Sequence, residues 1–120
     1  MRNLLLILLL LPVTAFAQFD NNPAQQRLWN SMTNAAPAYE MLLACERAVT
    51  ADLMLDDVKE MIALIVQNRN DARIALEMWD RARSQALIEY NSTLRGLAQD
   101  PEGSVCNQLE HNIIETMDSV

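Results

Sequence analysis

The chain has 120 residues, with 16 acidic and nine basic side chains and a formal net charge of −7. This length is enough for one domain and hardly for two. The negative charge argues against nucleic acid or an anionic membrane surface as a partner, because either would repel the protein.

The first residues have the features of an export signal. Arg2 supplies a positive charge, and Leu4–Leu11 is an unbroken apolar run that ends at Pro12. A membrane-spanning helix needs about 20 apolar residues, and this run is roughly half as long. Ala15 and Ala17 then occupy the two small-residue positions that signal peptidase reads. These features predict a cleaved signal peptide.

Cleavage before Gln18 removes residues 1–17 and leaves 103 of the 120 residues. Because Arg2 is lost, the net charge changes from −7 to −8. We expect the mature chain, 18–120, to be a single helical domain, with residues 18–23 as a polar, flexible lead-in. An export signal places it in the periplasm or outside the cell, with no stable membrane insertion after cleavage.

The mature chain has the pattern of an all-α protein. Glycine is scarce, and alternating runs rich in β-branched and aromatic residues are absent. Apolar residues recur every three or four positions, which predicts a short helix at 24–34 and longer helices at Pro37–Val49, Leu53–Val66, Ala72–Ala98 and 104–118. The expected fold is a small up-down bundle of about four helices. The same spacing places Val49, Tyr90 and Val105 on inward faces.

Cys45 and Cys106 are the only cysteines, and both lie on predicted inward faces. Periodicity alone also allows one fused helix over 53–98, which would be about 68 Å long. The two connections to the cysteines reach at most about 28 Å each, and the disulfide adds about 6 Å. The total, about 62 Å, is too short, so a fused helix and an intramolecular bridge exclude each other.

The polar run "QNRND", residues 67–71, allows a hairpin break that removes this conflict. In an oxidising compartment, two cysteines on apolar faces most often form a structural disulfide. We therefore predict a Cys45–Cys106 bridge that ties the helices together. A redox-catalytic role is not expected, because neither cysteine belongs to a C-x-x-C pair that would lower a thiol pKa.

Residues with catalytic potential form no recognisable constellation. His111 is the only histidine, and the densest carboxylates, Asp56, Asp57 and Glu60, fit the start of the helix predicted from Leu53. A structural zinc site would need four closely spaced Cys or His ligands, and no glycine-rich loop is present to hold a phosphate. We predict no catalytic, cofactor-binding or metal-binding residues, no cofactor and no enzymatic activity.

Two further patterns bear on binding. The mature chain has six methionines, a residue type that fills irregular cores and also lines adaptable surfaces; core filling is the expectation. Arg73, Glu77 and Arg81 follow one another at four-residue spacing, which is typical of a solvated helix face with its own ion pairs.

Two classes of protein are similar in outline. The stretch "ALIEYNSTLRGLAQD", residues 86–100, resembles the Gln- and Ala-rich helices of minor pilus subunits of type IV secretion systems. The small, exported, all-helical architecture with one disulfide is similar to that of acid-activated periplasmic chaperones. Likeness at this level does not transfer function.

The leading hypothesis is a periplasmic binding or assembly protein of the cell envelope whose partners are proteins. The alternatives are an acid- or stress-activated periplasmic chaperone and an accessory or minor subunit of a secretion or conjugation apparatus.

Overall fold

The computed structural model describes residues 23–118; the expected signal peptide, residues 18–22 of the expected lead-in and the last two residues lie outside this part. Pro23, the last residue of the expected flexible lead-in, is instead the first residue of a helix. The described chain contains five helices and no strand, which confirms the all-α prediction. Their bounds are Pro23–Ala44 (α2), Ala48–Ile65 (α3), Arg69–Glu89 (α4), Asn91–Gln99 (α5) and Ser104–Asp118 (α6).

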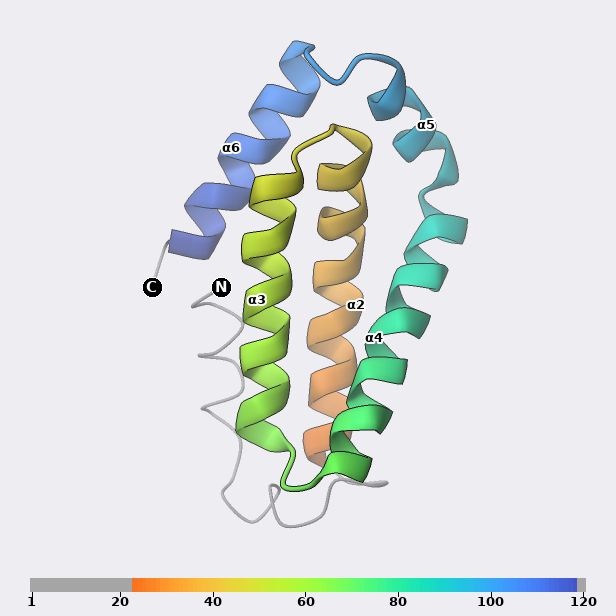
Figure 1. Ribbon diagram of the computed structural model, residues 1–120. Helices are drawn as coiled ribbons and strands as arrows, with labels where there is room; N and C mark the ends of the chain where they lie inside the picture. The colour runs from red at the N-terminus through yellow and green to blue at the C-terminus, as the bar shows by residue number, and fades with distance from the viewer. Residues whose placement is uncertain (1–22, 119–120) are drawn as a thin grey trace.

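The helices form four rods that alternate in direction (Figure 1). α3 returns antiparallel to α2, α4 and α5 together run in the direction of α2, and α6 returns. α2 is the central element, since it contacts each of the other four helices. α3 and the α4–α5 rod lie on different sides of it. The predicted up-down bundle is therefore confirmed, with one rod divided into two helices.

The helix α2 is longer than expected. It joins the predicted segment 24–34 and the start of the next predicted helix into one element that passes through Pro37. An internal proline removes a backbone hydrogen bond and costs about 3 kcal/mol. The offsetting gain is burial on both sides of Pro37, where Leu28 and Leu42 are completely buried; each such leucine contributes about 1.5–3 kcal/mol.

The end of α2 also differs from the prediction. The helix ends at Ala44 instead of Val49, because Glu46 adopts a left-handed backbone conformation with φ of 59°. The Arg47 amide donates to the Leu42 carbonyl at 2.8 Å, and the Glu46 amide donates to the Leu43 carbonyl at 3.0 Å. This is the Schellman arrangement that ends a helix. Val49 belongs to the next helix and is exposed, so its predicted inward position is wrong.

The polar run 67–71 does separate two helices. α3 ends at Ile65, and the Asn68 side chain accepts a hydrogen bond of 2.9 Å from the Asp71 amide at the start of α4. An asparagine cap satisfies one of the free amides of a first helical turn. The hairpin break is therefore confirmed, and the fused helix is excluded.

The single helix predicted over Ala72–Ala98 is interrupted at Tyr90. This residue has φ of −108° and ψ of 20°, and a new helix, α5, begins at Asn91. The run Asn-Ser-Thr that opens α5 favours such a break, because these side chains compete with the backbone for hydrogen bonds. Tyr90 is exposed at the junction, and Val105 is exposed on α6, so both predicted inward positions are wrong.

One hydrophobic core lies where α2, α3 and α4 meet. The predicted buried stripe of α3 is confirmed in full: Met54, Val58, Met61, Ile62 and Ile65. The methionines belong to the interior, since four are buried and the other two are partly buried against core residues: Met32, Met54, Met61 and Met78, then Met41 and Met117. The expectation of core filling is confirmed.

Candidate binding groove

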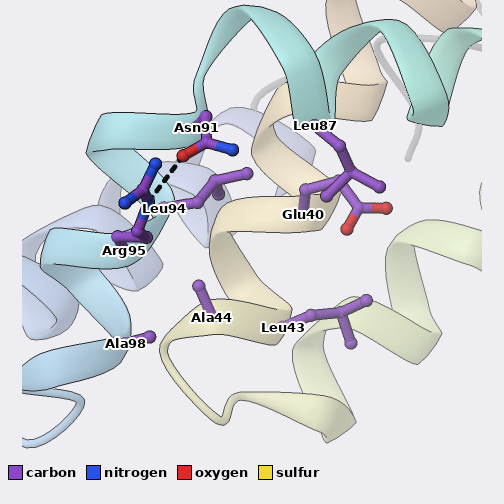
Figure 2. Close-up of a pocket in the computed structure, with 8 residues that line it drawn as sticks. All are labelled: Glu40, Leu43, Ala44, Leu87, Asn91, Leu94, Arg95 and Ala98. Carbon is purple, nitrogen blue, oxygen red and sulfur yellow. Dashed lines mark hydrogen bonds between the residues drawn. The ribbon is translucent and has the colours of Figure 1, made fainter.

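An apolar groove of about 410 Å³ runs between the end of α2 and the junction of α4 with α5 (Figure 2). Its volume lies within the range of about 300–1,000 Å³ that is usual for ligand clefts. The residues that line it come from all three helices: Glu40, Leu43, Ala44, Leu87, Asn91, Leu94, Arg95 and Ala98. We call this feature the α2–α5 groove.

The apolar surface of the groove comes from leucines that the core leaves uncovered. Leu43 and Leu87 are both exposed, with Leu87 at 45%. Leu94 on α5 is half-buried, while Ala44 and Ala98 are small residues at the same end of the groove. Exposed apolar side chains that gather in a concave surface are typical of interaction sites, whereas isolated ones are normal on any protein.

The acidic residue of the groove, Glu40, is buried and already paired. Its Oε1 accepts a hydrogen bond from Nε of Arg83 on α4. The Arg83 guanidinium also lies 4.9 Å from the centre of the Tyr39 ring, and the Tyr39 ring packs edge-on against Trp79 with centroids 5.5 Å apart. This cluster joins α2 to α4 beneath the groove. The Glu40 carboxylate therefore has a structural role.

The basic residue of the groove, Arg95, is differently placed. Its Nε donates a hydrogen bond of 2.6 Å to Oδ1 of Asn91, one turn earlier on α5. Within residues 23–118 no carboxylate forms an ion pair with it. The groove therefore combines exposed leucines with a positive charge whose partner is a neutral amide.

A second hollow, beside the disulfide, is polar, and its central side chain, Arg47, is already bonded to neighbouring residues. Arg47 donates to Glu110 at 2.8 Å, to Asn107 at 2.7 Å and to the Pro101 carbonyl at 3.0 Å. Thr50 donates to the second oxygen of Glu110 at 2.6 Å. These bonds attach α6 to the start of α3. The hollow therefore lies at a structural contact between the two helices, which we call the Arg47–Glu110 joint.

The disulfide lies at the same joint, as the sequence predicted. Cys45 and Cys106 are bonded, with Cα atoms 5.7 Å apart, and both are almost completely buried. The turn after α2 and the first turn of α6 are thereby tied at one end of the bundle. Leu97 of α5 packs against the two cysteines. The bridge therefore also holds the far end of α5, next to the groove.

Asp56, Asp57 and Glu60, which the sequence predicted at the start of a helix, lie further along α3 in the structure. α3 begins at Ala48 rather than Leu53, so Asp56 and Asp57 are in its third turn. Asp57 is buried, whereas Asp56 and Glu60 are exposed. The expectation that this acidic cluster serves the start of a helix is wrong.

The other polar candidates are on solvated surfaces. Nε2 of His111 lies 3.0 Å from Oε1 of Glu115, with both side chains mostly exposed. Arg73 and Glu77 form the expected i, i+4 ion pair, at 2.7 Å. Among residues 23–118, no group of three or more His, Cys, Asp and Glu residues is arranged to hold a metal ion. No helix of that part has the length and apolar character needed to span a bilayer.

Fold and disulfide together define a small bundle of helices tied by one covalent bridge. No protein-family model, curated protein or solved structure matches the chain.

Sequence reasoning did not find the α2–α5 groove. One signal was present, because Leu43 and Leu87 each follow a residue of the buried stripe, Leu42 and Ala86. A large apolar residue next to the stripe lies about 100° around the helix from it and widens the apolar face. Two such residues on different helices can meet, and only the packing of α2 against α4 and α5 brings these two together.

Proposed function

We propose that the protein is an exported, non-catalytic binding or assembly protein of the cell envelope that engages a protein partner through the α2–α5 groove. The observation that supports this proposal is the concave surface of exposed leucines between three helices. Charge supports a protein partner, since a net charge of −7 disfavours nucleic acid.

The shape of the groove favours a helix as the bound segment. Grooves between helices receive the apolar face of an amphipathic helix, whose anchors are spaced three or four residues apart. Leu43 and Leu87 provide the apolar contact on the two walls, and Ala44 and Ala98 leave room for large side chains of the partner. A few buried apolar anchors supply most of the affinity of such interfaces.

The chaperone and the secretion-apparatus accessory stay predictions from the sequence. Both also require a surface that binds other proteins, and the groove is compatible with either role. Binding in the groove differs from the chaperone role, because the folded bundle binds its partner at neutral pH.

The predicted export signal specifies the first residue of the secreted protein. The secreted protein should begin at Gln18, since Ala15 and Ala17 occupy the positions that signal peptidase reads. Intact-mass measurement of protein recovered from the periplasm or medium checks this. Recovery of a form that keeps residues 1–17 and needs detergent for extraction contradicts it.

Binding in the groove is tested by site-specific photo-crosslinking in intact cells. A photoreactive residue at Leu87 should form adducts with a protein partner, and the added substitution Leu43→Asp should abolish them by placing a charge in the apolar surface. The matched control is Leu76, which is on the same helix, is 47% exposed against 45% for Leu87, and lies outside the groove.

Comparison of the adducts formed from positions 87 and 76 decides whether the groove is the binding site. Adducts from position 87 but not from position 76 support the groove as the binding site. Equal labelling from both positions, or no adduct from position 87, contradicts it.

A further inference from the structure

We propose that the segment bound in the α2–α5 groove is the outer face of α3 from a second copy of this protein. This inference rests on the proposed function, because it names the partner of the same groove. The observation that supports this inference is a second surface of the protein, which complements the groove in both apolar character and charge.

The second surface is the solvent face of α3. Val49 and Leu53 are 78% and 49% exposed, and Asp56 and Glu60 continue the same face at helical spacing. Asp52 borders it and is also exposed. We call these five residues the acidic face. It has the form expected of a segment for a groove, with apolar anchors one turn apart and charges beside them.

The charges of the two surfaces are complementary in sum, because the acidic face has three carboxylates and one exposed base, Lys59, at its border. Within residues 23–118, Asp52, Asp56 and Glu60 form no ion pair, and Arg95 in the groove has none either. Docking α3 in the groove places the Arg95 guanidinium among these carboxylates while the leucines of both surfaces are buried. The net negative charge of each copy opposes association, but physiological salt screens it beyond about 8 Å. Contacts inside the interface are screened much less.

The positions of the two surfaces determine the type of assembly. α3 and the α4–α5 rod lie on different sides of α2, so one molecule carries the two surfaces in different places (Figure 1). Because the two surfaces lie on different sides, a copy seated in the groove does not also receive the acidic face of the same molecule; the contact is then heterologous, and it propagates into a ring or an open chain. The symmetric alternative, groove against groove, brings no free carboxylate to Arg95, because the carboxylate that lines the groove, Glu40, is buried and paired with Arg83.

The test uses purified, oxidised mature protein, residues 18–120, in sedimentation equilibrium over a wide range of concentration. The average mass of the natural protein should rise with concentration beyond that of a dimer. Leu87→Asp, which damages the groove, and Leu53→Asp, which damages the acidic face, should each abolish association. Arg95→Glu should weaken association several-fold.

The decisive step is to mix the two damaged variants. Leu53→Asp keeps an intact groove, and Leu87→Asp keeps an intact acidic face, so an equimolar mixture should form a one-to-one dimer that cannot grow. A symmetric contact predicts no such rescue. The matched control is Leu76→Asp on α4, at a site that is 47% exposed and outside both surfaces; it should associate like the natural protein.

Each outcome decides the proposal. A natural protein that stays monomeric at every concentration overturns it, and so does assembly that survives Leu53→Asp. Circular dichroism of each variant shows whether it has kept its helices; a variant that has lost them is replaced by Val49→Asp or Leu43→Asp at the same surfaces. Photo-crosslinking at Leu87 separates this inference from the proposed function. An adduct with a different protein leaves the groove as a binding site and overturns the self-association.

Discussion

Replacement of Cys45 and Cys106 by alanine is expected to lower the free energy of unfolding by about 2–5 kcal/mol. The bridge spans 61 positions of sequence, so in the chain-entropy model it restricts the unfolded state by about 4 kcal/mol. A domain of this size has a total stability of about 5–15 kcal/mol. The loss is therefore a large fraction of the stability of the fold.

The Arg47–Glu110 joint keeps α6 attached to the bundle after the disulfide is removed. It still holds α6 to the start of α3 through hydrogen bonds of 2.8 Å and 2.6 Å on the two Glu110 oxygens. The folded double-alanine variant should therefore keep its helical circular dichroism, and the loss should appear in the denaturant midpoint.

Urea unfolding of the variant and of the oxidised and reduced natural protein measures the effect. The reduced protein is the control for side-chain volume, because it keeps both sulfur atoms while it lacks the bridge. Thiol titration of the unfolded, unreduced protein should detect no thiol. Two titratable thiols per chain, or equal stability of the oxidised and reduced forms, contradict the prediction.

The substitution Trp79→Ala is expected to lower the free energy of unfolding by about 3–5 kcal/mol. Trp79 is 4% exposed and lies on the face of α4 that packs against α2. Its ring contacts the Tyr39 ring edge-on. The Arg83 guanidinium lies over the Tyr39 ring and forms an ion pair with Glu40. Removal of the indole leaves a cavity and loosens the support of this ion pair beneath the groove.

Thermal and urea unfolding followed by circular dichroism check the magnitude. Leu76→Ala is the control, because Leu76 is on the same helix and 47% exposed, so its loss should stay below about 1 kcal/mol. A similar, small effect of both substitutions contradicts the central place of Trp79 in the core. Leu28→Ala, at a completely buried site of α2, gives an independent reference of about 2–5 kcal/mol.

Local sequence accounts for the parts of the fold that depend on neighbours along the chain. The all-helical content follows from apolar spacing and scarce glycine, and the buried stripe of α3 follows from the same periodicity. The α3–α4 break follows from a polar run that contains a capping residue, Asn68. The disulfide pairing follows from the presence of only two cysteines and the reach of the chain between them.

The helix boundaries that were wrong are those where tertiary packing outweighs local preference. Pro37 signals a helix start, yet α2 continues through it because the buried residues on both sides share one stripe. The turn at Glu46 carries no glycine or proline signal, although its backbone is left-handed. Tyr90 continues the apolar period of α4 and still marks its end, since α5 follows a separate path toward α2 and the disulfide.

Sequence by itself therefore determined the class of fold and the covalent tie, and it predicts the export route, because each depends on composition or on spacing within a short segment. Tertiary structure alone decided the α2–α5 groove and the separate acidic face. Leu43 and Leu87 lie 44 positions apart in sequence, and whether they bury one another or share an open groove depends on the angle between helices. That angle is set by side chains of α2, α4 and α5 packing together, which no periodicity within a single helix encodes.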